Sequence, residues 1–299
     1  GVDAPEYLDT QSGIYARIAS LREEQGHLVE AGDYYTSATA ILEKLVAQSP
    51  NNVALRQRRG RVLVAFSALV ETNGQTREAL AMLESVVADT RELHDADPVN
   101  QRHTSDLAIY LNRAGSIRET IGDIGGAVSI MAESLELHES FASDGMGSPK
   151  QRVQTAATRT SLARLKLKVG DKAAARDLAV RACALHREVG GEISTPYSIT
   201  ARANGFLVMG DIERADDMVD AARSAWQEGF DLIEPVAKTS RDTTVLHRYM
   251  QLALRLEKIS IARDCAAELV EMGFRDADFI ETLRENDFPL PTERPPTGG

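Results

Sequence analysis

Three histidines at matching places in the sequence are the first candidates for chemistry. His94, His138 and His186, each preceded by a leucine, recur at long and nearly equal intervals along the chain. A series of imidazoles can bind metals or sense pH, because histidine changes charge near neutral pH. Residues so far apart belong to different packed helices, whose axes lie roughly 8–10 Å apart, too far for one metal ion. We interpret them as half-buried residues near helix ends, where a cation is mildly favourable, and expect no metal site.

Catalytic motifs are absent from the sequence. It has neither the GxxxxGK[ST] phosphate-binding loop nor the HExxH zinc helix. It also lacks an HRD catalytic loop, and Asp287-Phe288-Pro289 has no glycine to make a DFG motif. Cys183 and Cys265 each lie in an apolar helical pattern, which is typical of small buried hydrophobes rather than of a zinc or disulfide framework. We expect no enzymatic activity and no cofactor.

The distribution of charged side chains is the next feature that bears on partner binding. The chain of 299 residues carries a net charge of -11, which argues against broad nucleic-acid binding. Residues 150–189 nevertheless contain ten Lys and Arg against three Asp and Glu, which leaves +7 there and -18 elsewhere. The plainest interpretation is a solvated set of helix faces; the alternative is a surface that attracts an acidic partner.

Helices must position all of these residues. Apolar residues at helical spacing form stripes such as Leu107, Tyr110, Leu111, Ala114 and Ile117. No apolar run is long enough to span a bilayer, so we expect no membrane insertion. Two series of helix breakers alternate along the chain, which predicts helix hairpins. The first series is Gly32-Asp33, Gly74-Gln75, Gly122-Asp123, Gly170-Asp171 and Gly210-Asp211; the second is Pro50, Pro98, Pro149, Pro196 and Pro235.

Small residues flank the predicted turns. Gly115, Ala163 and Ala203 stand seven residues before a turn, and Ala127, Ala175 and Ala215 stand five residues after one. This arrangement resembles the tetratricopeptide repeat, although the turns are farther apart than the usual period of about 34 residues. The resemblance implies an all-α, right-handed superhelical solenoid of about six antiparallel hairpins. We expect a repeat domain over residues 1–285, with hairpins at about 10–49, 50–97, 98–147, 148–192, 193–232 and 242–273 and then a short capping helix.

The sequence also resembles a particular group of repeats. The stretches 96–107 and 122–138 are similar to the long repeats C-terminal to bacterial eukaryotic-like serine/threonine kinase domains. The chain starts with Gly1 rather than Met, and we expect it to be a fragment of a larger signalling protein. In the kinase-associated proteins that this chain resembles, such arrays commonly follow a single transmembrane helix. The resemblance therefore slightly favours an extracytoplasmic location, with a cytoplasmic location as the alternative. Residues 286–299 contain four of the ten prolines and predict a tail; a solvated tail is favoured over one in which Phe288 to Pro291 packs into a groove.

The resemblance implies where a partner binds, because the first helix of each hairpin lines the concave groove of such an array. Transferred residue by residue, the groove set is Arg61, Val64, Asn112, Ser116, Thr160, Arg164, Lys168, Tyr197, Thr200 and Asn204. Asn112 and Asn204 are similar to the asparagines of a carboxylate clamp, whereas Val64 and Thr160 depart from it. The first hypothesis is a non-catalytic scaffold that binds a protein or peptide, with an acidic partner favoured. The second is a sensor that holds a small anionic ligand with Tyr197, Arg164 and Asn204.

Overall fold

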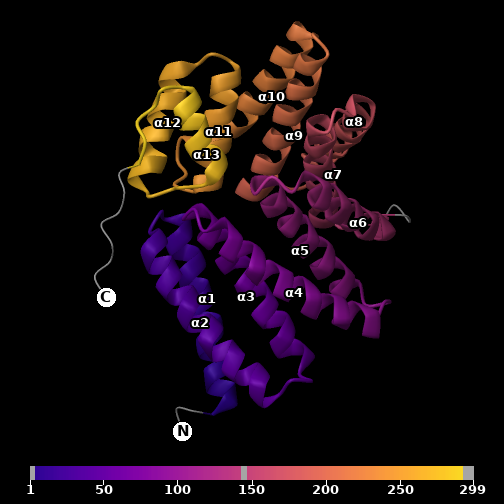
Figure 1. The fold of residues 1–299 in the computed structure, drawn as a ribbon, viewed down its shortest axis with the longest axis vertical. Coiled ribbons are helices and arrows are strands. Elements are labelled where there is room, and N and C mark those ends of the chain that lie inside the picture. Colours follow the sequence, from indigo (N-terminus) through magenta and orange to yellow (C-terminus); the bar gives the residue numbers. More distant parts are fainter. Residues whose placement is uncertain (1–3, 143–146, 292–299) are drawn as a thin grey trace.

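The fold is an all-helical solenoid of six antiparallel hairpins and a final single helix (Figure 1). The computed structural model describes residues 4–142 and 147–291, and within them it has thirteen helices and no strand. The helices are α1 (Pro5–Glu24), α2 (Leu28–Gln48), α3 (Val53–Thr72), α4 (Thr76–Ala96), α5 (Gln101–Thr120), α6 (Ile124–Ala142), α7 (Pro149–Lys168), α8 (Lys172–Val189), α9 (Pro196–Ala215), α10 (Val219–Ala237), α11 (Thr243–Arg255), α12 (Ile259–Glu271) and α13 (Ala277–Glu285).

Residues in the left-handed region form the turns inside the hairpins. The first five such turns have positive φ and are almost equally spaced along the chain, at Gly26, Gly74, Gly122, Gly170 and Asp217. The sixth turn, at Glu257, follows the fifth after a shorter stretch of sequence. Glycine suits this position because it has no Cβ to clash in the left-handed region. The repeat is therefore more regular than the sequence pattern indicated.

Two of the predicted turns were wrong. Gly32-Asp33 lies inside α2 and Gly210-Asp211 lies inside α9, so neither reverses the chain. Glycine also occurs where two helices approach closely, because it has no side chain to keep them apart. A Cβ on Gly210 would lie 2.3 Å from Nε1 of Trp226. Pro235, likewise, lies inside α10 rather than between hairpins. As a result the fifth hairpin ends at Ala237, five residues beyond its expected limit.

Small residues occupy the closest contacts between the two helices of a hairpin. Counted from the true turns, the position five residues after the turn is alanine in every hairpin, and each of these alanines is fully buried: Ala31, Ala79, Ala127, Ala175, Ala222 and Ala262. Ala215, which the wrong turn placed in this set, is instead the last residue of α9. The resemblance to tetratricopeptide packing thus extends over all six hairpins.

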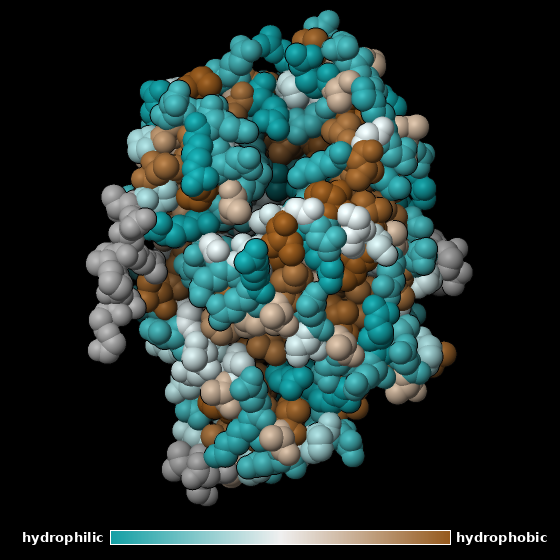
Figure 2. Space-filling model, viewed as in Figure 1, coloured by the Kyte–Doolittle hydropathy of each residue, from teal (hydrophilic) through white to brown (hydrophobic). Residues whose placement is uncertain are grey.

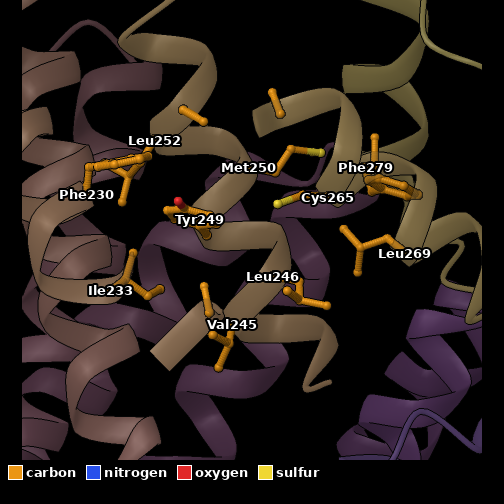
Figure 3. Close-up of a cluster of buried hydrophobic side chains, with 14 of the residues drawn as sticks. Phe230, Ile233, Val245, Leu246, Tyr249, Met250, Leu252, Cys265, Leu269 and Phe279 are labelled. Carbon is orange, nitrogen blue, oxygen red and sulfur yellow. The ribbon is translucent and has the colours of Figure 1, made fainter. Parts of the chain in front are cut away.

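The last part of the chain has the largest hydrophobic core (Figure 3). Phe230 stacks on Tyr249 with ring centroids 4.8 Å apart, and Phe274 lies 5.1 Å from Phe279. Cys265, like Cys183 in α8, is buried, as the sequence predicted. Phe288 is also buried in this core, so the solvated tail that we favoured is wrong at that residue: its apolar ring fills space beside α12, under the guanidinium of Arg263.

The end of the solenoid returns to its beginning. The backbone N–H of Arg275, between α12 and α13, donates a hydrogen bond of 2.7 Å to the carbonyl oxygen of Thr72 at the end of α3. Met272 lies against the turn at Gly26, where an added Cβ would approach its side chain to 3.1 Å. In Figure 1 the yellow α12 and α13 lie beside the indigo α1 and α2. The superhelix therefore closes on itself, and its concave groove becomes a central cavity.

Candidate functional site: the central cavity

The central cavity lies on the concave side and has a volume of about 940 Å³. Its walls are the C-terminal halves of α5, α7 and α9, together with the end of α3, the inner face of α11 and one side of α13. Figure 2 shows a deep hollow among hydrophilic side chains over the region of α9 and α11. Four residues of the predicted groove set line this cavity: Ser116, Arg164, Lys168 and Asn204.

The other six predicted groove residues do not line the cavity. Arg61 is exposed and Tyr197 is 57% exposed, both away from the cavity walls. Val64 packs against the core between α3 and α5. Thr160 and Thr200 are buried, and the amide nitrogen of Asn112 donates to the hydroxyl of Thr158 at 3.2 Å. The C-terminal helices close the groove, so the cavity is limited to one end of the first helix of each hairpin. The sequence pattern could not show this closure.

Most cations around the cavity are neutralised by carboxylates of a neighbouring hairpin. Glu119, on α5, accepts Nη2 of Arg164 at 2.7 Å and Nζ of Lys168 at 2.8 Å. Arg113 forms an ion pair with Glu71, and Arg255 pairs with Asp211 at 2.8 Å. These pairs cross from one hairpin to the next, so they fix the walls of the cavity relative to one another.

The basic segment 150–189 is neutralised in the same way. Nine of its ten cations have a carboxylate within ion-pairing distance. Arg176, for example, donates to Glu213 at 2.8 Å and also to Asp216, and Arg187 bonds Glu228 at 2.8 Å. The positive charge of this segment thus meets the acidic side chains of the hairpins next to it.

Arg248 differs from the other cavity arginines. Its Nη1 donates to the neutral amide oxygen of Gln251 at 2.6 Å, and among the described residues no carboxylate stands within ion-pairing distance of it. Burial lowers the pKa of Arg248 to about 10, with a contribution from the nearby positive charge of Arg164. The carboxylates of Asp278, Asp211 and Asp276 act on this pKa in the opposite direction. An arginine remains charged at a pKa of about 10, so Arg248 is a cation on the cavity wall without a carboxylate in direct contact.

Acidic residues lie next to Arg248 and toward the place where the two ends of the solenoid meet. Gln251, which accepts a hydrogen bond from Arg248, donates one to Asp278 at 2.7 Å. Burial raises the pKa of Glu23 to about 7, against the opposing effect of a hydrogen bond from the Tyr35 hydroxyl. Asp276 and Asp278, at the start of α13, lie with His247 so that one ligand atom of each is within 4.8 Å of the others. The sequence pattern did not reveal this group, because His247 lies in α11 and Asp276 precedes α13, some thirty residues later in the chain.

The three histidines of the sequence pattern do not make a site. His138 and His186 are buried and not half-buried as we expected, and burial lowers the pKa of each to about 4. His94 lies 3.2 Å from the hydroxyl of Thr104. Buried imidazoles that stay neutral serve as packing residues, and none of the three lines the central cavity.

Comparison with known proteins identifies the repeat. Residues 155–193 match the tetratricopeptide repeat family. The structure of a Rap protein complexed with Competence and Sporulation Factor is similar with a TM-score of 0.65 at 13% identity, over 92% of this chain and 68% of that one. A signal transduction ATPase with a tetratricopeptide repeat sensor from Pyrococcus horikoshii is similar with a TM-score of 0.54 at 14% identity, over 94% of this chain and 38% of that one.

Sequence similarity to curated proteins is local. The Serendipity locus protein alpha of Drosophila pseudoobscura pseudoobscura is 30% identical over 132 residues, which is 42% of this chain. The chain spans about a quarter of the length of that relative. Within the described ranges, every helix is too short or too polar to cross a membrane. The chain is a tetratricopeptide-like array.

Proposed function

We propose that this tetratricopeptide-like array is a non-catalytic binding module of a larger signalling protein, and that it holds a peptide segment of a partner protein in its central cavity. The cavity is the place where side chains from the different hairpins converge. A ligand there contacts several repeats at once, as expected for the concave surface of a solenoid. We further propose that the larger protein carries a serine/threonine kinase domain; the sequence resemblance alone supports this part of the proposal.

The observation that carries the proposal is the arginine left without a carboxylate. Arg248 has only the Gln251 amide as a described polar partner, and it lines the cavity together with Arg164 and Asn204. The oxygen Oδ1 of Asn204 is buried without a hydrogen-bond partner in the described structure. An arginine and an amide together bind a carboxylate and its neighbouring peptide group, because a charge-assisted hydrogen bond is among the stronger polar contacts.

The sequence led us to expect an acidic partner. The ion pairs around the cavity reduce the number of acidic groups that such a partner could place there. Glu119 already holds both Arg164 and Lys168, so a long acidic segment has few free cations to meet. The cavity also presents Asp276, Asp278, Glu281 and Glu285. We therefore propose a peptide with a single carboxylate, which Arg248 binds, rather than a long acidic segment.

Two structural relatives support a role of this kind by analogy. The Rap protein was solved complexed with Competence and Sporulation Factor, and the archaeal ATPase carries its repeats as a sensor. At 13% and 14% identity these likenesses concern the fold alone.

A small anionic ligand is the second candidate. The cavity of about 940 Å³ is at the upper end of the size range of small-molecule pockets. Closure by α13 limits its length, which favours a compact ligand over a long strand of peptide. Of the three residues that we predicted for such a sensor, Arg164 and Asn204 line the cavity and Tyr197 does not.

A peptide-binding screen tests the proposal. A library of random hexapeptides, each with a free or an amidated C-terminus, is applied to the chain, and the affinity of the enriched peptides is measured by fluorescence anisotropy. Arg248→Gln should weaken binding about 10- to 100-fold, the range expected for a hydrogen bond to a charged group. The matched control is Arg223→Gln, on α10 outside the cavity, whose side chain is 65% exposed. Equal affinity of the two variants would refute the assignment, and binding of small di- or tricarboxylates in place of peptides would favour the second candidate.

A further inference from the structure

Three side chains at the acidic end of the cavity can share one ion. We propose that His247, Asp276 and Asp278 form a site for a divalent first-row transition metal ion of the zinc class. His247 comes from α11, Asp276 precedes α13 and Asp278 lies in its first turn. One ligand atom from each lies within 4.8 Å of the others. The site goes beyond the proposed function, because it needs no peptide in the cavity.

The histidine is the strongest part of this site. Its side chain is only 12% exposed, and its buried Nε2 has no hydrogen-bond partner in the described structure. A buried polar atom without a partner is rare in folded proteins, because it has lost its water without compensation. The rings of Phe274 and Phe279 lie edge-on to the imidazole, with centroids 5.4 Å and 5.7 Å away. The apolar contacts thus hold Nε2 in place beside the two aspartates.

The distances suit a bridging ion better than a direct bond. Nε2 of His247 lies 3.7 Å from Oδ2 of Asp278, which is longer than a hydrogen bond. Two ligands bound to zinc at about 2.0–2.2 Å, with tetrahedral angles, are separated by about 3.4 Å. The His–Asp pair therefore needs a shift of only a few tenths of an ångström, and the widest pair of the three needs a larger shift or a wider angle at the metal.

Both aspartates are oriented by contacts of their own. Oδ1 of Asp276 accepts the backbone N–H of Asp278 at 3.0 Å and that of Phe279 at 3.3 Å, which fixes this residue as the cap of α13. Oδ2 of Asp278 accepts the amide of Gln251 at 2.7 Å. Hydrogen bonds that orient the ligands are usual around metal ions and raise the affinity.

The local charge also favours a dication, because two carboxylates lie within 4.8 Å of each other and of the imidazole, and Glu71 adds negative charge near Asp276. The mixed nitrogen and oxygen set selects zinc and its neighbours over magnesium and calcium, which take oxygen ligands.

The position of the site links it to the cavity and to the closure. All three residues line the cavity, so a bound ion has coordination positions open toward any ligand there. The ion also ties α11 to α13 next to the hydrogen bond between Arg275 and Thr72. We therefore expect metal binding to stabilise the closed form of the superhelix.

Calorimetry on the untagged chain tests the site, after treatment with a chelator and dialysis. Titration with zinc chloride should give one site, with magnesium chloride binding at least 100-fold more weakly, and zinc should raise the melting temperature. The variant Asp278→Asn keeps the size of a side chain that is 64% exposed, and it should weaken zinc binding at least tenfold with an unchanged circular dichroism spectrum. Cobalt(II) should give visible absorption bands with the wild type and lose them with the variant.

The matched control is Glu281→Gln, another carboxylate of the cavity wall outside the three, which should bind zinc within twofold of the wild type. Asp276→Asn, which keeps an oxygen to cap α13, is the second variant and should lower affinity in the same way. Absence of a stoichiometric zinc site in the wild type would overturn the inference. So would equal zinc affinity in the wild type and in both aspartate variants.

Discussion

The regular hairpins from α1 to α10 and the closing segment from α11 to α13 reach stability by different means. In the regular hairpins the closest contacts are made by alanine, glycine and serine, at fixed distances from each turn. In the closing segment the helices shorten to 13 and 9 residues, and aromatic rings such as Phe274 and Phe279 fill the core. The repeated hairpins are thus specified by the spacing of small residues, whereas the closing segment is specified by the shape of the surface that its aromatic side chains cover.

Removal of an aromatic ring from the closing segment should have the largest effect. Phe279 is fully buried, and Phe279→Ala should lower the free energy of unfolding by about 3–5 kcal/mol through lost burial and a cavity. Hydrogen exchange should show the loss of protection in α11 to α13, with α5 to α8 retaining theirs. Leu290→Ala, at a side chain 47% exposed, is the control and should change little. A loss spread evenly over the chain would mean that the two regions unfold as one unit.

A buried histidine should make the regular hairpins sensitive to acid. Burial lowers the pKa of His186 to about 4, so between about pH 6.5 and 4 the unfolded chain binds a proton that the folded chain refuses. The stability from this residue is present above pH 6.5 and is lost as the pH falls through that window, by about 3 kcal/mol. Urea denaturation of His186→Leu should show a flatter dependence on pH in this range. An unchanged slope would contradict the assignment.

A larger side chain at one of the buried alanines should have the next largest effect, and this effect is expected in the regular hairpins. Ala175 is fully buried five residues after the turn at Gly170, and Ala175→Leu should destabilise the fold by about 1–3 kcal/mol. Ala173→Leu, at an exposed position of the same helix, is the matched control. Arg118, an obvious surface choice, would be a poor control because it bonds Glu84 and Asp123. Equal melting of both leucine variants would show that the alanine contact does not limit helix approach.

The closing contact should respond to pH in the opposite direction from His186. Burial raises the pKa of Glu23 from 4.5 to about 7, so the folded chain keeps a proton that the unfolded chain releases. This contribution is fully present below about pH 4.5 and is lost as the pH rises to about 7. Glu23→Gln removes the loss and should make the chain about 1–2 kcal/mol more stable than wild type at pH 8. Urea denaturation at pH 4.5 and 8 should show the difference at the higher pH, and a difference confined to the lower pH would refute it.

The sequence predicted the repeated part of the molecule well because its signals are local. Leu107 and Leu111 mark a buried stripe, and the glycines at 74, 122 and 170 mark turns, each within one hairpin. The same local signals misplaced two turns, since a glycine for positive φ and a glycine for close packing look alike. Gly210 makes room for Trp226, which no spacing rule revealed.

The candidate site could be predicted only in part, for a physical reason. Arg164, Lys168, Ser116 and Asn204 share the inner face of consecutive first helices, and their place follows from the repeat. Arg248 and His247 face them only because the superhelix closes, and closure depends on contacts between residues at opposite ends of the chain, as between Thr72 and Arg275. Sequence periodicity carries no information about such distant contacts.

The hydrogen bond between Arg275 and Thr72 also limits how this molecule can change in length. An open solenoid gains or loses a repeat at small cost, because each repeat contacts only its neighbours. Here an inserted hairpin would move α13 past the end of α3, and a deleted one would bring the two ends into collision. The number of hairpins between α3 and α13 is therefore constrained by geometry, and variation among related chains in this stretch should fall in side chains and loops rather than in repeat number.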